Sequence, residues 1–314
     1  MPRKLKLDST KAELSAIDAL IQESIILSDP VGKMQYEYRK SLLEAELAQI
    51  KKEDSKASVA LFFGGKPVFG SIGVNADFAG RALNDFQEII SKVFTNLELG
   101  SLGTRGPISF SAGSQLMITG VAKGSFGFVL DEISDQMELA DTSLKNVVDE
   151  VALMIDKTGA NEQNKFEEVL SDIDDRTLIS LRNFFVNLDK NSATLRLVEG
   201  DNEFQLDEAA IHRGRERTEN TSIDESEDFI DGVLLGFLPE HRKFELRLSN
   251  AVVIYGTATK NAAEAYSEML TRGISIVDKK CRIKASVRII KPINRPEKVL
   301  YRLLEFIGID SSGA

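Results

Sequence analysis

Residues 281–290 are the segment that most constrains the fold of this chain. Their side chains alternate almost without fault between apolar and polar, and a period of two is that of a β-strand with one face in a core and the other in solvent. The apolar positions are Cys281, Ile283, Ala285, Val287 and Ile289, and the polar positions between them are Arg282, Lys284, Ser286 and Arg288. The sequence therefore predicts a strand with one core face and one basic face.

The segments around this strand predict a small β-barrel over residues 229–314. We expect further strands at residues 229–238, 244–248, 252–257 and 274–277, an inserted helix at 261–272 and a terminal helix at 296–307. Three strands, a helix and two strands is the element order of an OB-like barrel, and an SH3-like barrel with an inserted helix is the alternative. The terminal helix should pack on the barrel, with Pro296 near its first turn.

Residues 1–56 predict a helical hairpin. Apolar residues recur at helical spacing over residues 9–28 and 33–53, and Asp29-Pro30-Val31-Gly32 interrupts them. The resulting apolar stripe can pack on the domain that follows, or it can form a helical interface with another copy of this chain or another protein.

Residues 57–190 predict an α+β domain. Strands at 57–63 and 68–74 precede an amphipathic helix over 78–97, and two more strands flank Lys123-Gly124. This ββαββ order is typical of one helix across an antiparallel sheet. Apolar stripes within residues 141–189 then predict an acidic helical connector, and the polar residues 191–228 predict a linker or hairpin before the barrel.

Gly127 lies in a predicted strand and is not explained by the neighbouring turn. The segment 121–130 reads VAKGSFGFVL, in which Phe126, Phe128 and Leu130 share one face of the strand. A glycine on the opposite face usually marks a bulge or a close approach by another backbone or a ligand.

Composition limits the classes of function. A length of 314 residues suggests two or three folded units. The single cysteine, Cys281, excludes an internal disulfide, and with two histidines it leaves too few ligands for a structural zinc site. The sequence shows no signal peptide and no apolar run long enough for a membrane span, so we expect a cytoplasmic protein without a membrane partner or cofactor.

Charge is distributed unevenly along the chain. The net charge is −10, yet residues 272–302 carry ten Lys or Arg and two Asp or Glu, while residues 141–189 carry five and eleven. Basic side chains neutralise phosphates and provide most of the non-specific affinity for nucleic acid. The basic block can therefore bind nucleic acid, or it can dock on the acidic helices of this chain or of a partner.

The barrel supplies the main candidate site. OB-like barrels bind ligands across strands two and three, between the loops that join strands one to two and four to five. We assign these loops to residues 239–242 and 278–280. The candidate contacts to nucleic acid or an acidic partner are Arg242, Arg247, Tyr255, Lys279, Lys280, Arg282, Lys284 and Arg288, together with Arg213, Arg215 and Arg217 in the polar linker.

Other candidate sites are weaker. Arg105 in one glycine-rich loop, and Lys123 with Gly124 in another, form a possible anion site, although turn geometry alone explains both loops. The carboxylates Asp172, Asp174 and Asp175 lack the spacing of a calcium loop. We therefore expect a solvated helix face and no metal site there.

The leading functional expectation is a non-enzymatic binding or assembly protein. The sequence contains none of the common hydrolase, metalloprotease, P-loop or dinucleotide motifs. Segments GSFGF and IDGVLLGF resemble parts of bacterial proteins, which suggests only a bacterial setting. A bacterial complex with a regulatory or defence role, assembled through residues 1–56, would suit a binding protein of this kind. The alternative is a DNA- or RNA-binding protein that uses the barrel. The third is a metal-dependent nuclease that would use Asp207, Glu208 and Glu245.

Overall fold

The computed structural model describes residues 1–50, 55–99, 112–122, 126–133 and 140–309. The chain forms two compact units, each made of several chain segments. Unit 1 comprises Met1–Thr95, Ile108–Phe166 and Ser180–Arg215, and unit 2 comprises Asn96–Pro107, Glu167–Ile179 and Glu216–Ala314. The fold is mixed helix and sheet, as predicted, and within the described ranges no helix has an apolar stretch long enough to cross a bilayer.

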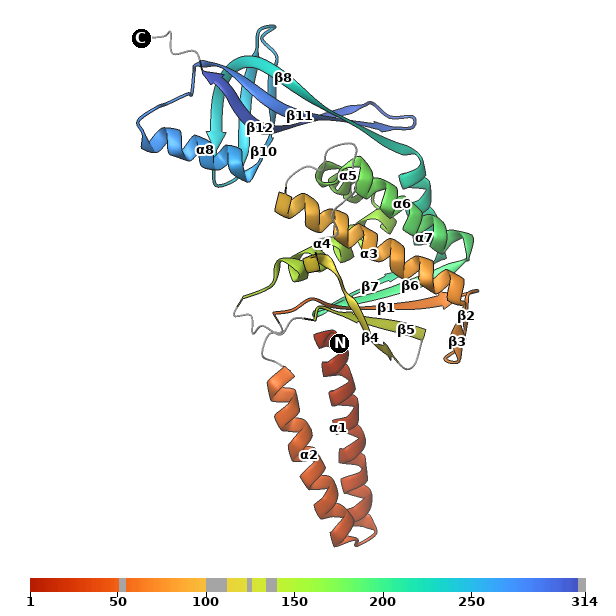
Figure 1. The fold of residues 1–314 in the computed structure, drawn as a ribbon. Coiled ribbons are helices and arrows are strands. Elements are labelled where there is room, and N and C mark those ends of the chain that lie inside the picture. Colours follow the sequence, from red (N-terminus) through yellow and green to blue (C-terminus); the bar gives the residue numbers. More distant parts are fainter. Residues whose placement is uncertain (51–54, 100–111, 123–125, 134–139, 310–314) are drawn as a thin grey trace. The chain divides into compact units, whose positions relative to one another are not determined.

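Unit 1 is built on a five-stranded antiparallel sheet in the order β4-β5-β1-β6-β7 (Figure 1). The strands are β4 (Met117–Ala122), β5 (Phe126–Asp131), β1 (Ser58–Gly65), β6 (Ala193–Glu199) and β7 (Asn202–Leu206). The central strand β1 pairs with β5 and β6. Its residues 59–63 are all buried, because side chains pack on both faces of the sheet.

The prediction that residues 68–74 form one strand paired with β1 is wrong. This segment forms a separate short hairpin of β2 (Val68–Phe69) and β3 (Gly73–Val74), which folds back through a turn in which the Ile72 amide donates to the Phe69 carbonyl at 3.0 Å. The sequence pattern could not distinguish a strand from this hairpin. The pairing of β1 depends instead on β6, which lies more than a hundred residues further along the chain.

Helices cover the sheet. Helix α3 (Ala76–Leu99) corresponds to the predicted amphipathic helix, and its Phe78 ring lies 5.2 Å, centroid to centroid, from that of Phe63 on β1. The acidic segment contains α4 (Ser143–Gly159), α5 (Gln163–Asp172) and α6 (Asp175–Lys190). The apolar stripes of these helices are buried, so the segment is not a connector alone; its residues 167–179, in α5 and the start of α6, belong to unit 2.

The segment predicted as a polar linker is folded. It contains the β6–β7 hairpin of the unit 1 sheet, helix α7 (Glu208–Glu219) and the start of β8. The Asp207 carboxylate begins α7 by accepting a hydrogen bond from the Ala210 amide at 2.7 Å.

Gly127 lies beneath an aromatic ring. It pairs with Phe62 of β1, and a Cβ added to Gly127 would lie 2.7 Å from Cε1 of Phe62, with Cδ1 of that ring closer still. The Arg196 guanidinium lies 4.7 Å from the centroid of the same ring. The close approach expected at Gly127 is therefore made by a side chain of the neighbouring strand, and not by a backbone or a ligand.

The N-terminal hairpin is present and consists of α1 (Arg3–Ile26) and α2 (Pro30–Ile50), which run side by side in Figure 1. Ion pairs join the helices between Arg39 and Glu13 at 2.6 Å and between Lys40 and Asp18 at 2.8 Å. The predicted stripe forms the seam between α1 and α2. Near the start of α1, Leu5 packs on the sheet beside Phe62.

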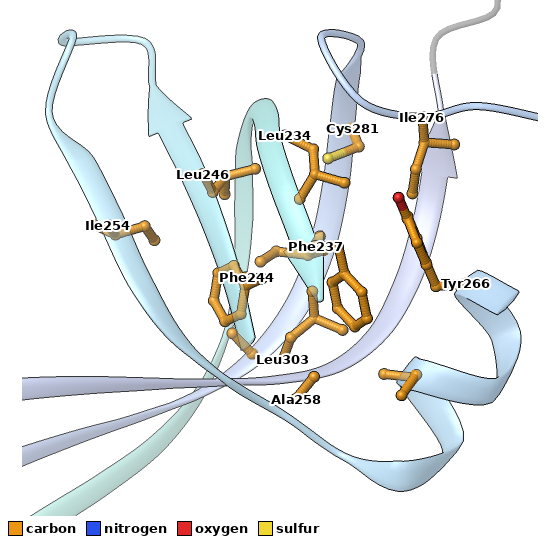
Figure 2. Close-up of a cluster of buried hydrophobic side chains, with 14 residues drawn as sticks. Leu234, Phe237, Phe244, Leu246, Ile254, Ala258, Tyr266, Ile276, Cys281 and Leu303 are labelled. Atoms are coloured by element: carbon orange, nitrogen blue, oxygen red, sulfur yellow. The ribbon is translucent and has the colours of Figure 1, made fainter. Parts of the chain in front are cut away.

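Unit 2 contains a closed five-stranded barrel in the order β10-β12-β11-β8-β9. Its elements are β8 (Thr221–Leu238), β9 (Lys243–Leu248), β10 (Val253–Ala258), α8 (Lys260–Thr271), β11 (Lys280–Pro292) and β12 (Lys298–Ile309). The pair β10–β12 is parallel, and the other ladders of the barrel are antiparallel. Leu234, Phe244, Leu246 and Leu303 fill the interior, and Tyr266 joins them from α8 (Figure 2).

Two predicted elements of the barrel are wrong. Residues 296–307 form strand β12 instead of a helix, and residues 274–277 form no strand. The apolar residues of the last segment satisfy both helical and strand spacing, whereas the barrel needs a fifth strand to bond β11 and β10. The loop between the fourth and fifth strands is consequently 293–297, and not 278–280.

Candidate nucleic-acid interface on the barrel

The basic face of β11 is partly neutralised by β8. The acidic segment before Phe229 extends β8 beyond its predicted start and pairs with residues 285–289 of β11, so its carboxylates lie near the basic side chains of that strand. Lys284 pairs with Glu227 at 2.7 Å and Lys291 with Asp224 at 2.6 Å. Lys284 therefore contributes less free positive charge than the sequence pattern indicates.

Arg288 is not on an exposed face. Its side chain is buried, and its guanidinium donates to the carbonyls of Ile173 at 2.6 Å and Ser171 at 3.3 Å, at the end of α5 and just beyond it. In the same region Arg295 pairs with Glu167 at 2.8 Å. Both arginines therefore contact part of the acidic segment of this chain, within unit 2. Docking of the basic block on acidic helices was the alternative to nucleic-acid binding.

Three other predicted residues meet around one pocket. Arg247 on β9 and Lys280 and Arg282 on β11 line a cavity of about 760 Å³ at one end of the barrel. The strand register explains this: Val233 of β8 pairs with both Lys280 and Arg247, so these two lie in one row across three strands. Adjacent strands are about 4.8 Å apart, which places the two positions about 10 Å apart.

The pocket has an excess of positive charge. The acidic residue that lines the pocket is Asp231, whose carboxylate lies 3.7 Å from the Arg282 guanidinium. Both side chains are exposed, so this ion pair contributes little free energy in water. Arg247 and Lys280 are exposed and, within the described part of the chain, neither forms an ion pair. Two cationic groups are therefore available to an anionic ligand.

Two exposed aromatic rings lie on strands β10 and β8 of the same barrel. Tyr255 on β10 is 77% exposed and lies on the outer face of the β9–β10 ladder, opposite Glu245 and two pairs along the ladder from Arg247. Phe229 on β8 is 56% exposed, and the Arg282 guanidinium lies 5.5 Å from its ring centroid. Sequence reasoning missed Phe229, although its alternation with the outward-facing Asp231 could have identified it.

The first predicted loop lies at the other end of β9 from the pocket. Arg242 is exposed in the loop 239–242, at the opposite end of β9 from Arg247. At about 3.3 Å per residue the two arginines mark the ends of a track of roughly 16 Å, with Tyr255 between them. Lys279, by contrast, is half-buried and precedes β11.

Arg213 and Arg215 of the former linker belong to unit 1, whereas Arg217 falls in unit 2. Arg213 donates to the carbonyl of Gly159 at 3.0 Å, and Arg215 pairs with Asp189 at 2.7 Å. Both lie on α7 together with Arg217. Arg213 and Arg215 therefore make their contacts within unit 1 and are not part of the unit 2 barrel.

The remaining candidates are not assembled into a site. Arg105, Lys123 and Gly124 lie outside the described residues. Asp174 is buried and caps α6 by accepting from the Thr177 amide at 2.7 Å, so the expected solvated face is wrong at that position. The described ranges contain no cluster of three potential metal ligands, and Asp207 and Glu208 lie in unit 1 whereas Glu245 lies in unit 2.

No protein-family model, curated protein or solved structure matches this chain.

Proposed function

We propose that this chain is a non-enzymatic binding protein that binds single-stranded nucleic acid on the outer surface of the unit 2 barrel. The observation that carries the proposal is the strand order. The long first strand pairs with the second and the fourth, the third and fifth form a parallel pair, and a helix lies between the third and fourth. This arrangement is typical of OB-type barrels and supports the proposal.

The chemistry of the surface supports the same ligand. OB-type barrels bind oligonucleotides across their second and third strands, which here are β9 and β10. This face carries Arg247 and Tyr255, with Arg242 at its end and the pocket cations Lys280 and Arg282 beside it. Cations would neutralise phosphates while aromatic rings stack on bases, which every base permits.

A charge-reversal variant tests the phosphate contacts. Arg247→Glu combined with Lys280→Glu is expected to weaken binding of a labelled 20-nucleotide oligothymidine by at least tenfold in fluorescence anisotropy, because two phosphate contacts become repulsive. Wild-type binding should also weaken steeply as salt is raised, and the variant should show a shallower salt slope.

The matched control makes the same change of charge in unit 1. Lys11→Glu on α1 with Arg81→Glu on α3 alters two exposed side chains that lie on neither β9 nor β10 and should leave binding within about twofold. Equal losses in the control and in the Arg247/Lys280 variant would exclude this surface.

Tyr255→Ala and Phe229→Ala should each cost about 1 to 3 kcal/mol of binding free energy if bases stack there.

A further inference from the structure

Three side chains lie in one row across β9, β10 and β12. Thr257 on β10 pairs with Lys243 on β9 and with Arg302 on β12. The next residues of β10 and β12 are Ala258 and Leu303, which point into the barrel core (Figure 2). Because side chains alternate along a strand, the row itself faces outward. It places a cationic group on each side of one hydroxyl.

Arg302 lacks a compensating negative charge. It is half-buried, and among the residues that the structure describes its guanidinium forms no ion pair and donates one long hydrogen bond, to the Asn96 side-chain oxygen at 3.5 Å. Burial, and then the positive charges of Arg288 and Arg242, lower the pKa of Arg302. A guanidinium that is partly removed from water beside other cations is costly unless an anion compensates it.

The carboxylates near Arg302 are engaged elsewhere. Glu225 accepts a hydrogen bond from the Ser286 hydroxyl at 2.6 Å. Asp174 accepts from the Thr177 amide at 2.7 Å, at the start of α6. Each carboxylate raises the pKa of Arg302, but by less than either neighbouring arginine lowers it. Positive charge therefore exceeds negative charge around Arg302.

Arg242 and Lys243 add further cationic groups at this end of the barrel. The Ala258 amide donates to the Arg242 carbonyl at 2.7 Å, which holds the loop before β9 against the end of β10. Both cationic side chains are exposed, and neither forms an ion pair with another described residue. The nearest carboxylate of β9, Glu245, lies two pairs further along the β9–β10 ladder. An anion that approaches the row therefore meets unpaired positive charge.

We propose, on the basis of the nucleic-acid binding proposed above, that Lys243, Thr257 and Arg302 bind a phosphate of the same strand at the end of β9 opposite the pocket. Ammonium and guanidinium groups donate charge-assisted hydrogen bonds to phosphate oxygens, and a threonine hydroxyl is a further donor. Lys243 and Arg247 are four residues apart, so the two phosphate contacts lie about 13 Å apart along β9. The bound strand therefore runs lengthwise over β9 and β10.

Tyr255 favours nucleic acid over an acidic protein as the anion. Its exposed ring lies between the row and the pocket on the same outer face. A strand in which phosphates and bases alternate uses both the cations and the ring, because every base can stack on an aromatic side chain. A chain of carboxylates would use the cations alone.

The salt dependence of binding tests this second contact. For single strands the logarithm of the association constant falls with the logarithm of salt concentration by about 0.7 per phosphate contact. Lys243→Gln with Arg302→Gln should therefore reduce this slope by about 0.7 and weaken binding of a labelled 20-nucleotide oligothymidine at least tenfold in fluorescence anisotropy. Lys11→Gln with Arg81→Gln removes the same charge from exposed positions of unit 1 and should leave slope and affinity unchanged.

A second variant avoids the half-buried arginine. Arg242→Gln with Lys243→Gln changes only exposed side chains and should also weaken binding and reduce the slope. Urea unfolding verifies that each variant is folded. If wild-type protein binds oligothymidine and both variants keep its affinity and slope, the second contact is absent while the proposed function stands. If wild-type protein does not bind oligothymidine, both fail. Tighter binding of a polyglutamate peptide than of oligothymidine would overturn the choice of nucleic acid.

Discussion

Replacing Gly256 with alanine is expected to open the barrel of unit 2. Gly256 pairs with Tyr301 in the parallel β10–β12 ladder that closes the ring. A Cβ at position 256 would lie 2.8 Å from the carbonyl carbon of Tyr301, and the carbonyl oxygen would be closer. Because the obstacle is backbone and not a flexible side chain, the two strands would have to separate.

The expected loss of stability is about 3 kcal/mol or more, as for other substitutions that disrupt buried packing or backbone pairing. Separation of β10 from β12 would also expose Leu303, which is fully buried between them and the core. The cost therefore combines lost ladder hydrogen bonds with lost apolar burial.

Cys281 provides the measurement, since it is the sole cysteine of the chain and is buried on β11. Burial raises the pKa of its thiol to about 11, so it should react slowly with a thiol reagent while the barrel is closed. If the substitution lowers the free energy of barrel opening by about 3 kcal/mol, the thiol should react about a hundredfold faster. Gly236→Ala is the control, because a Cβ there meets no atom within 4 Å; equal reaction rates in the two variants would contradict the prediction.

Glu199→Gln is expected to stabilise the protein at alkaline pH and to flatten its pH dependence. Glu199 on β6 is buried beside Asp149 of α4, and Asn202 donates to its carboxylate at 3.3 Å. Burial, and then the hydrogen bond and negative charge of Asp149, raise the pKa of Glu199 to about 8 from an ordinary value of 4.5. The folded state therefore holds a proton that the unfolded chain releases.

The direction of the pH effect follows from this difference in bound protons. Between pH 4.5 and 8 the folded state binds more protons than the unfolded state, so the free energy of unfolding falls as pH rises and levels off above 8. The fall should amount to a few kcal/mol. Glutamine is neutral throughout and keeps an N–H donor for Asp149, so the variant should match the wild type near pH 5 and exceed it at pH 9.

Urea unfolding followed by circular dichroism at pH 3, 5, 7 and 9 measures this effect and that of the control. Glu203→Gln is the opposite control. Hydrogen bonds from Arg196 and Gln205 lower the pKa of Glu203 to about 2, so its carboxylate stabilises the fold above pH 4.5 and that contribution is lost as pH falls toward 2. A Glu199→Gln variant that follows the wild-type pH profile would contradict a protonated Glu199.

Local patterns predicted the parts of the fold whose partners lie nearby or whose period is unambiguous. Helix α3, the α1–α2 hairpin and strand β11 appear where the sequence predicted them. The candidate surface was predicted in part: Arg247, Lys280 and Arg282 surround one pocket, whereas the guanidinium of Arg288 is buried against α5 and its end. Strand alternation assigns a basic side chain to a face, but it does not show what covers that face.

The sequence alone determined the alternation of β11, the apolar face of α3 and the acidic and basic segments, because side-chain order and backbone period are local properties. Tertiary structure decided that residues 298–309 pair as β12, that the acidic start of β8 lies against basic β11, and that Phe62 covers Gly127. Each of these depends on hydrogen bonds or contacts between segments far apart in the chain. Apolar residues spaced three or four positions apart are compatible with a helix. Only the hydrogen bonds to neighbouring strands show that such a segment is a strand.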